Sequence, residues 1–434
     1  MAQLITSQRG TADVLPQDSA KWQYVESKLA ETVKRFGYLE TRVPTFEATE
    51  LFARSVGDTT DVVDKEMYTM TDKGGRSITL RPEGTAGVVR SFLQNGVFAG
   101  TLPVRAYYML SCFRYEKPQA GRMREFHQLG IELFGAPDAD ADCEVIRVAK
   151  ACLDALGIKK VRLEINSIGC PECRPAHRAA LYDHFKAHEE ELCDTCKDRL
   201  ERNPLRIVDC KSPICKNIAK DAPIALDYLC DECREHFAKV CKLLDEAGIE
   251  YTVNPQIVRG LDYYSKTVFE FVHEGAGAQG VVCGGGRYDG LVQQLGGPAL
   301  PGIGFGMGIE RLLMTMEACG CSFPEEKECV CYIGAMGPAA GAKAAQLVAE
   351  MRKEGFWAEC DTMGRSVKAQ MKYANKLGAK FSMILGDSEL EQGKANLKKM
   401  DDGTVSEISL KNAEEMLAVI YAAKLSDVAE SLSL

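Results

Sequence analysis

The chain has 434 residues, of which 46% are hydrophobic and 26% are charged, and its formal net charge is −9 at pH 7. This length predicts two or three domains rather than a single core. The first residues lack a signal-peptide pattern, and no apolar run approaches the ~20 residues of a membrane helix, so we expect a cytoplasmic protein outside the membrane. The negative charge argues against a protein coated with nucleic acid but allows a local basic groove.

The N-terminal part predicts one helix followed by short elements. Residues 19–36 have apolar side chains at spacings of three and four, which is typical of a helix. We then expect a short strand over residues 38–44 and a short helix over residues 45–53. Residues 67–80 predict two strands joined by a turn at residues 72–75.

Two polar residues follow, at a junction between strand and helix. Glu83 and Thr85 are flanked by Pro82 and Gly84, which impose an irregular backbone, so both polar side chains could point out of the sheet into a cleft. The same residues could instead cap the helix that follows, with the Glu83 carboxylate near its positive end. The pattern alone favours neither interpretation.

Residues 107–135 predict a long antiparallel hairpin around a basic loop that contains Pro118 and Gly121. Side chains on a strand alternate between faces. One face of the second strand is therefore expected to carry His127, Leu129, Ile131 and Leu133, and the other Phe126, Gln128, Gly130 and Glu132. Arg114 and Glu116 of the first strand point the same way as each other. Gly130 leaves room for a ligand on this polar face, although an isolated hairpin of this kind is more often a solvated surface.

After a helix near residues 141–156 and a strand at 161–165, the chain becomes rich in paired cysteines. Their spacings are typical of thiolate zinc ligation, although unliganded thiols are the alternative. Eight ligands could make two tetrahedral sites, or one site with spare thiols. A closed site of four thiolates would be structural. The candidate ligands are Cys170, Cys173, Cys193, Cys196, Cys210, Cys215, Cys230 and Cys233, within an insertion at residues 167–247.

Three later segments have residues suited to ligands. Residues 259–264 read R-G-L-D-Y-Y and interrupt a strand, so an arginine and two tyrosines are available there. Residues 284–290 read G-G-G-R-Y-D-G and predict a glycine turn, which alone is weak evidence for a ligand. In residues 302–308 glycine occupies every second position, and a helix with Arg311 follows. Such a bare strand face suits a flat base or a phosphate, although the P-loop and dinucleotide fingerprints are absent.

Residues 319–328 predict a linker, and the remainder predicts a small domain. Beyond the linker we expect strands at 329–333, 357–360 and 381–385 that alternate with helices at 339–354 and 367–377. This alternation indicates an α/β domain with a partly parallel sheet. Lys368, Lys372 and Lys376 form either a solvated helix face or a strip that contacts RNA.

In their order and spacing, these segments resemble the bacterial-type histidyl-tRNA synthetase family, one of the class II aminoacyl-tRNA synthetases. Residues 113–126 are similar to motif 2, residues 304–311 to motif 3, and residues 36–56 to motif 1, which builds the dimer interface in this class. The resemblance implies an α+β fold. It comprises an antiparallel-sheet catalytic domain (1–325), the cysteine-rich insertion (167–247) and a C-terminal α/β anticodon-binding domain (329–434). The full cysteine set departs from many family members, so zinc does not follow from the resemblance.

The resemblance also implies residue roles. Histidine would be bound through its amino group by Glu83 and Thr85, through its imidazole by Tyr264 and Glu132, with Tyr263 beside them, and with help from Gln128. Arg114 would bind the α-phosphate of ATP, with the catalytic Arg259 across from it. Adenine would lie between Arg311 and Phe126, and Arg122 would hold the outer phosphates.

The implied reaction forms histidyl-adenylate from histidine and ATP with Mg²⁺, then transfers histidine to the 3′ end of tRNA(His), in a homodimer. Two alternatives stay open. One is a non-catalytic regulatory paralogue that senses histidine. The other is an RNA-binding or scaffold protein built on the cysteine-rich insertion, which would leave the polar sheet face unexplained.

Overall fold

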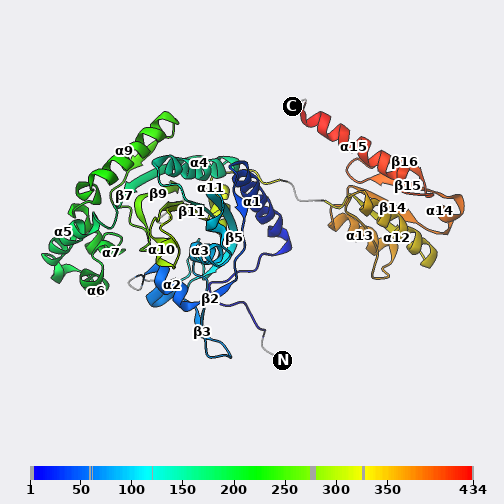
Figure 1. Ribbon diagram of the computed structural model, residues 1–434. Helices are drawn as coiled ribbons and strands as arrows, with labels where there is room; N and C mark the ends of the chain where they lie inside the picture. Colours follow the sequence, from blue (N-terminus) through cyan, green and yellow to red (C-terminus); the bar gives the residue numbers. More distant parts are fainter. Residues whose placement is uncertain are drawn as a thin grey trace. The chain divides into compact units, whose positions relative to one another are not determined.

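The computed structural model describes residues 4–57, 60, 62–119, 121–273, 280–324 and 328–432. The chain forms two compact units, Met1–Pro324 and Glu325–Leu434 (Figure 1). The division falls within residues 319–328, where the sequence predicts a linker. Among the described helices, none is both long and apolar enough to cross a membrane.

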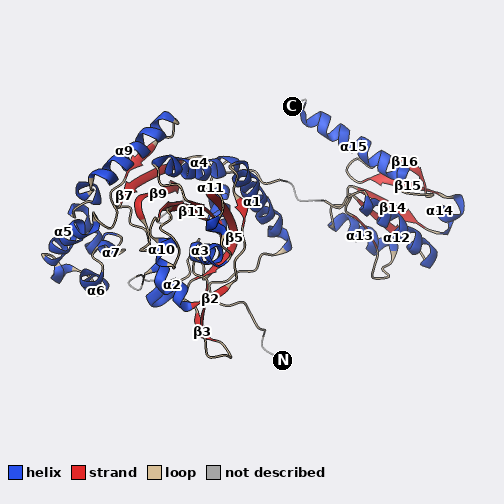
Figure 2. Cartoon of the chain, viewed as in Figure 1, coloured by secondary structure: helices blue, strands red, loops and turns tan. Residues whose placement is uncertain are grey.

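The first unit is built on an eight-stranded sheet, which is antiparallel except at its two edges (Figure 2). Only the pairs β1–β5 and β7–β8 are parallel, so the predicted antiparallel sheet is confirmed in all but those pairs. In spatial order its strands are β1 (Leu39–Glu40), β5 (Val104–Phe113), β6 (Glu125–Phe134), β11 (Gly302–Gly308), β10 (Val281–Arg287), β9 (Ser265–His273), β7 (Val161–Ser167) and β8 (Tyr251–Val253).

Helices cover the two faces of this sheet differently. The main core lies between one face and α1, α4 and α11, while α3 packs on the opposite face. The buried side of each helix is mainly apolar, which explains this placement, as in α1, which buries Val25, Leu29 and Val33. Among the described residues of the first unit, the helices outside the cysteine-rich region are α1 (Pro16–Arg35), α2 (Thr49–Val56), α3 (Thr85–Gln94), α4 (Ala139–Ala155), α10 (Leu291–Gln294) and α11 (Ile309–Ala318), with short helical turns η1 (Val62–Glu66) and η2 (Val97–Ala99).

The predicted hairpin is confirmed as β5 and β6, and so are the two faces of the second strand. The first strand ends at Phe113, so Arg114 and Glu116 lie in the loop and not on the strand, where the sequence had predicted them. Leu129, Ile131 and Leu133 lie in the main core. Glu132 points to the opposite face, where α3 packs and where Thr85 bonds to it. The face that carries α3 is called the site face below.

Strand β11 confirms the glycine pattern, with Ile303, Phe305 and Met307 in the main core. At Gly304 the glycine is required, because a Cβ there would lie 2.2 Å from the carbonyl oxygen of Ile131 on the paired strand. At Gly308 the nearest atom would be 3.8 Å away, which is ordinary contact.

We therefore expect Gly304→Ala to lower the free energy of unfolding by about 3 kcal/mol, because the paired backbones must separate. Gly308→Ala is the matched control and should change it by less than about 0.5 kcal/mol. Urea unfolding followed by circular dichroism measures both. Equal stability of the two variants would contradict the close approach of β11 to β6.

The strand predicted over residues 38–44 is much shorter and covers only β1 (Leu39–Glu40). Two further local predictions are wrong. Residues 46–48 form a strand rather than a helix, in a small sheet of β2 (Phe46–Ala48), β4 (Ser77–Leu80) and β3 (Thr69–Thr71), and only α2 after them is helical. Residues 284–287 belong to β10 rather than to a turn, because two neighbouring strands pair with them on both sides. Glycine has weak strand propensity, so this pairing comes from tertiary context.

The cysteine-rich region is helical and lies beside the β7 side of the sheet (Figure 1). It has its own small core, which includes Leu181, Phe185 and Leu200. Its last helix differs, since Val240 and Leu244 belong to the main core. The elements are α5 (Arg174–Lys186), η3 (Glu189–Glu191), α6 (Asp194–Arg202), α7 (Leu205–Val208), α8 (Pro213–Ile218), η4 (Ala219–Asp221), η5 (Ala225–Tyr228) and α9 (Asp231–Glu246).

The second unit confirms a small α/β domain with a partly parallel sheet. Strands β13, β12 and β14 are parallel neighbours, and β15 and β16 extend the sheet antiparallel. The sequence prediction did not include that last hairpin, α14 or α15. The bounds are β12 (Cys331–Ala335), α12 (Pro338–Lys353), β13 (Ala358–Cys360), α13 (Val367–Lys376), β14 (Phe381–Leu385), α14 (Asp387–Gln392), β15 (Lys394–Lys399), β16 (Val405–Ser409) and α15 (Glu414–Leu432).

Candidate active site

The start of α3 places Glu83 and Thr85 on the site face. The Glu83 carboxylate accepts hydrogen bonds from the backbone N–H groups of Thr85 (2.7 Å) and Ala86 (2.9 Å). The Thr85 hydroxyl instead donates to Glu132 at 2.7 Å. The Glu83 carboxylate therefore lies at the positive end of α3, as the capping interpretation expects, but Thr85 does not cap the helix, contrary to that interpretation. Burial raises the pKa of Glu83, and the helix N–H groups and Arg114 oppose this rise.

Glu132 lies at the centre of a buried cluster of polar side chains. One carboxylate oxygen accepts hydrogen bonds from Thr85 and from the Tyr108 hydroxyl at 3.1 Å, and the other accepts one from the Tyr288 hydroxyl. The side chain is almost fully buried. Burial raises the pKa of Glu132 to about 8, against the opposing effect of these hydrogen bonds, and the nearby Glu83 raises it further.

The sequence prediction did not include Tyr108 and Tyr288. Tyr108 lies opposite Gly130 in the hairpin, and its ring fills the space that a side chain at Gly130 would need. This pairing of a tyrosine with a glycine, read from the hairpin register, is the signal that could have identified it. Tyr288 covers Gly302 in the same way, but on another strand pair, which sequence alone does not align.

Tyr263 and Tyr264 complete the cluster and lead to Arg259. The two tyrosine rings lie 4.8 Å apart, and the Tyr263 ring lies 5.6 Å from that of Tyr288. The Arg259 guanidinium lies over Gly284, forms an ion pair with Glu270, and is 5.6 Å from the Tyr264 ring. Burial would lower the pKa of Arg259, but Tyr264 and Glu270 outweigh it and keep the cation charged.

Three further arginines gather on the hairpin loop and the start of α11. Arg114 donates to the Pro82 carbonyl (2.8 Å) and lies 5.4 Å from the Phe126 ring. Arg311 donates to the carbonyls of Val281 and Gly121. Burial lowers the pKa of Arg311, and the positive charge of the neighbouring Arg122 lowers it further. Arg122 also forms an ion pair with Glu116, which compensates part of its charge. Arginines that repel one another favour a bound anion.

The glycine face of β11 is only partly bare. The side chain of Gln128 occupies the space over Gly306, and that of Glu132 occupies the space over Gly304. Room for a flat group therefore remains only near Gly308, beside Arg311. The structure thus joins a cluster of carboxylate and tyrosine side chains to a cationic region. Such a site can hold a polar amino acid next to a polyphosphate.

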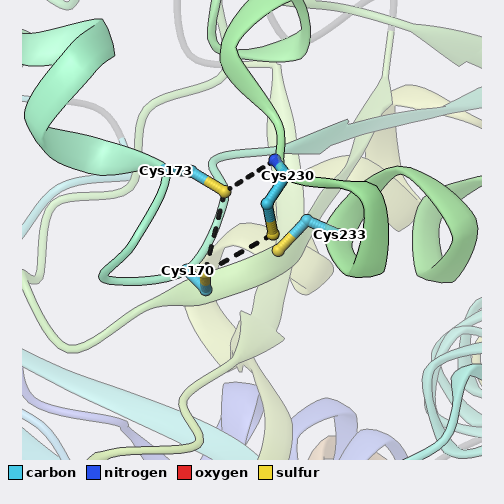
Figure 3. A group of neighbouring side chains, drawn as sticks. All are labelled: Cys170, Cys173, Cys230 and Cys233. Atoms are coloured by element: carbon cyan, nitrogen blue, oxygen red, sulfur yellow. Dashed lines mark hydrogen bonds between the residues drawn. The ribbon is translucent and has the colours of Figure 1, made fainter.

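The eight predicted cysteine ligands fall into two groups, and Figure 3 shows the first. The outer group is Cys170, Cys173, Cys230 and Cys233, and the inner group is Cys193, Cys196, Cys210 and Cys215. Within each group all four sulfurs lie within 4.8 Å of one another. Both groups could therefore bind a metal ion, and both are remote in sequence from the motifs of the site face.

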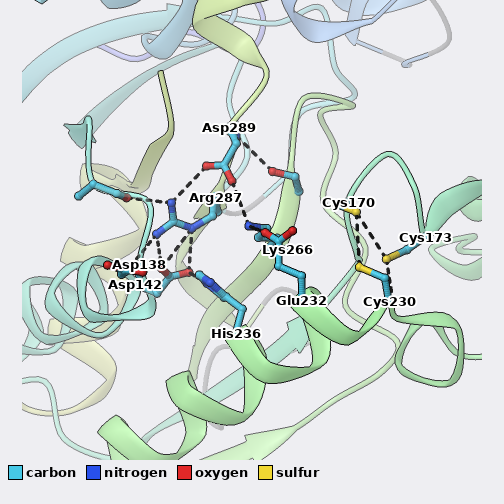
Figure 4. Close-up of polar contacts among 12 residues, drawn as sticks. Asp138, Asp142, Cys170, Cys173, Cys230, Glu232, His236, Lys266, Arg287 and Asp289 are labelled. Atoms are coloured by element: carbon cyan, nitrogen blue, oxygen red, sulfur yellow. Dashed lines mark hydrogen bonds and ion pairs between the residues drawn. The ribbon is translucent and has the colours of Figure 1, made fainter. Parts of the chain in front are cut away.

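Arg287, next to Tyr288, takes part in a buried ion pair that stabilises the fold (Figure 4). Its fully buried guanidinium forms an ion pair with the buried Asp142 of α4 and also bonds Asp289. His236 of α9 lies 3.3 Å from Asp142. Burial opposes ionisation of Asp142, but Arg287 and His236 outweigh it and hold its pKa below the usual value.

We expect Asp142→Asn to lower the free energy of unfolding by about 3 kcal/mol at pH 7, because it leaves a buried cation without its partner. A carboxyl whose pKa is lower in the folded state than in the unfolded state stabilises the fold at pH values above its unfolded-state pKa. This stabilisation is lost as the pH falls through its folded-state pKa. The difference from the wild type should therefore shrink at acidic pH. Asp140→Asn, on the same helix but in an exposed pair with Lys239, should cost less than about 1 kcal/mol. Similar losses for both variants would contradict this account.

Class II aminoacyl-tRNA synthetases build their site on an antiparallel sheet, between an arginine-bearing hairpin and a strand that runs into a helix. The first unit has this arrangement in β5, β6, β11 and α11, which defines the class. Residues 10–312 match the family described as histidyl-tRNA synthetase, and residues 329–419 match an anticodon binding domain. The chain belongs to the histidyl-tRNA synthetase family.

Individual relatives agree with this family. A histidine–tRNA ligase of Acetivibrio thermocellus is 56% identical over 94% of this chain and 98% of its own length. The apo S. aureus histidyl-tRNA synthetase has a similar structure, with a TM-score of 0.80, 38% identity, and coverage of 96% of this chain and 99% of that one. An ATP phosphoribosyltransferase regulatory subunit/histidyl-tRNA synthetase from Bacillus halodurans is 21% identical with a TM-score of 0.64, covering 89% and 100%, and shows the shared fold alone.

Proposed function

We propose that this chain activates L-histidine with ATP to histidyl-adenylate and then transfers histidine to the 3′ end of tRNA(His). Identity of 56% with a histidine–tRNA ligase over nearly the whole chain supports this enzymatic function. The observation that carries this proposal is that the buried polar cluster around Glu132 adjoins the cationic region at Arg114, Arg259 and Arg311.

The cluster of carboxylate and tyrosine side chains is the proposed histidine site. Glu83 and Thr85 would hold the α-amino group, since both are buried at the start of α3. Glu132 and Tyr264 would bond the two imidazole nitrogens. A pocket that must hydrogen-bond an imidazole discriminates strongly, by roughly 10⁴-fold, against side chains that lack those atoms. Tyr263 beside this pair and Gln128 over Gly306 would complete the site.

The cationic region is the proposed ATP site. Arg114 and Arg259 would bind the α-phosphate from two sides, and Arg122 would bind the outer phosphates. Adenine would lie between the Phe126 ring and the Arg311 guanidinium, where the face near Gly308 has room. Glu270, on this face beside Arg259, has carboxylate oxygens that fit Mg²⁺. When bound, Mg²⁺ would neutralise charge on the departing diphosphate.

The proposed chemistry depends on positioning and charge. The histidine carboxylate is already ionised, so its attack on the α-phosphorus needs no general base. The bond to the α-phosphorus forms as the bond to the diphosphate breaks, and negative charge increases on the phosphoryl oxygens. Arg114 and Arg259 would stabilise that charge from fixed positions. The zinc expected in the cysteine-rich region takes no part in this step.

The partners follow from the same reaction. The second unit, which matches an anticodon binding domain, supports tRNA binding, and its strip of lysines on α13 is one candidate contact. A homodimer is part of the proposal, supported by exposed apolar side chains at Leu39 and Phe46 in the motif 1 segment. The cytoplasmic location expected from the sequence remains a prediction.

The regulatory paralogue remains the second candidate, because a protein described partly as a regulatory subunit shares the fold. Charging of tRNA separates the two. The full chain with ATP, Mg²⁺ and labelled histidine should attach histidine to a tRNA(His) transcript and not to a transcript of another tRNA. A folded protein that binds histidine but leaves tRNA(His) uncharged would favour the regulatory function.

A further inference from the structure

The distances between the cysteine sulfurs match a single metal ion in each group. Four thiolates around one Zn²⁺, each with a bond of about 2.3 Å, lie about 3.8 Å from one another in a tetrahedron. In the outer group the Cys170 sulfur is 3.6 Å from that of Cys173 and 3.9 Å from that of Cys230. In the inner group the Cys193 and Cys210 sulfurs are 3.8 Å apart.

Other uses of these thiols fit the geometry less well. A disulfide would bring two sulfurs to about 2.05 Å, whereas all of these cysteines are free. An iron–sulfur cluster has several atoms inside its ligand shell, so its cysteine sulfurs would lie further apart than those of a single ion. A sulfur-only tetrahedral shell selects zinc among the common single ions without redox chemistry.

Backbone N–H groups already support the sulfurs as thiolates. The Cys173 sulfur accepts a hydrogen bond from Cys230 N at 3.1 Å (Figure 3). In the inner group the Cys215 sulfur accepts one from Cys193 N at 3.3 Å, and Ser212 N donates to Cys210. Such outer contacts orient metal ligands and stabilise their negative charge. At least two cysteines of each group are buried, and a shell of four thiolates would leave no open position for a substrate.

We propose that each group holds one Zn²⁺ ion and that the two sites are nested. The first and last cysteine pairs form the outer site, and the two middle pairs form the inner site within it. We further infer that the region they close positions the segment 259–264, a step that rests on the proposed function. Each site would bind one borderline-soft divalent cation through four thiolate ligands.

The outer site lies where the chain leaves the sheet after β7 and returns through α9 (Figure 4). Next to it, the Gly169 carbonyl accepts a hydrogen bond from Lys266 N at 2.9 Å. Glu232 of α9 forms an ion pair with the Lys266 side chain at 2.8 Å. Arg174, which follows Cys173, donates to the Tyr264 carbonyl. The outer site therefore fixes the backbone at the end of the tyrosine pair.

The inner site holds α6, α7 and α8 together, and α7 carries Arg206. This mostly buried arginine donates to the Arg259 carbonyl at 2.8 Å and to the Asp262 carboxylate at 2.7 Å. Arg206 itself takes no part in the proposed formation of the adenylate. It is a positioning residue that links the inner site to the backbone of the catalytic arginine.

Metal content tests the two sites directly and independently of activity. The full chain, purified without chelators and analysed by mass spectrometry of its metals, should contain about two zinc ions. Replacement of zinc by Co²⁺ should give the thiolate charge-transfer bands of a tetrahedral site. Folded protein without stoichiometric zinc, or with iron in its place, would overturn the proposal.

Paired substitutions test the nesting. Cys170→Ser with Cys230→Ser removes two ligands of the outer site only and should leave one zinc ion. If neighbouring pairs in sequence shared a metal, the same variant would damage both sites and lose both ions. Cys241→Ser, on α9 but outside the groups, should keep two. Where a variant does not fold, titration of the wild type with a mercurial until all thiols have reacted should release two zinc ions per chain, and release of one ion would contradict the two sites.

Arg206→Ala tests the positioning. We expect two zinc ions, an unchanged fold and a kcat for adenylate formation that falls roughly tenfold, because the Arg259 backbone loses its anchor. The histidine KM should change much less. If the wild type is active and Arg206→Ala has the same kcat, the positioning role would be overturned. Loss of activity in the wild type itself would count against the proposed function and leave the zinc sites standing.

Discussion

Arg259→Ala should reduce histidine-dependent adenylate formation by roughly 10³-fold, because a fixed cation that stabilises charge on the phosphoryl oxygens is lost. Histidine binding should survive within about threefold, since binding measures the ground state and not the charge that develops in the reaction. Isothermal calorimetry with histidine and single-turnover adenylate formation measure the two quantities separately.

Arg76→Ala is the control for this variant, because Arg76 is an exposed arginine that pairs with Asp72 in the β3–β4 turn. It should leave both quantities unchanged. Removal of Arg259 also leaves its partner Glu270 unpaired, and burial raises the pKa of that carboxyl. Unchanged adenylate formation in the Arg259 variant would contradict its catalytic role.

Glu132→Gln should lower kcat/KM for histidine by roughly 10²-fold, because the site loses the carboxylate proposed to bond the imidazole. The KM for ATP should stay close to that of the wild type and is the internal control. A variant with an unchanged KM for histidine would show that Glu132 does not contact the substrate.

The same variant should change how stability depends on pH. Burial raises the pKa of Glu132 to about 8. A carboxyl whose pKa is higher in the folded state than in the unfolded state contributes its full stabilisation at pH values below its unfolded-state pKa. This stabilisation is lost as the pH rises through its folded-state pKa. Between about pH 5 and pH 8 the wild type should therefore lose stability relative to Glu132→Gln, as measured by urea unfolding. Parallel curves across this range would contradict the raised pKa.

The sequence predicted the elements whose patterns are local. The hairpin of β5 and β6, the glycine alternation of β11 and the alternating helices and strands of the second unit all follow from spacing along one segment. The resemblance of these segments to one family then gave the candidate residues, from Glu83 to Arg311. The structure brings Thr85 and Glu132 into contact on the site face, and it places Arg114 and Arg311 at the hairpin loop and on α11.

What the sequence could not predict depends on neighbours across the fold. Tyr108 and Tyr288 bond Glu132 only because three separate segments meet in the sheet. The glycines of β10 became a strand because β9 and β11 pair with them, against their low propensity. Pairing of the first cysteines with the last required α9 to return to the end of β7, and no spacing along the chain shows that return.

The most direct test of the central claim is ATP–diphosphate exchange with each of the amino acids in turn. The account predicts exchange that depends on histidine and is negligible with the others. Only the histidine side chain can form hydrogen bonds with both Glu132 and Tyr264 while the histidine carboxylate reaches the α-phosphorus. Absence of exchange in folded protein that binds histidine would contradict it, and so would exchange supported equally by another amino acid.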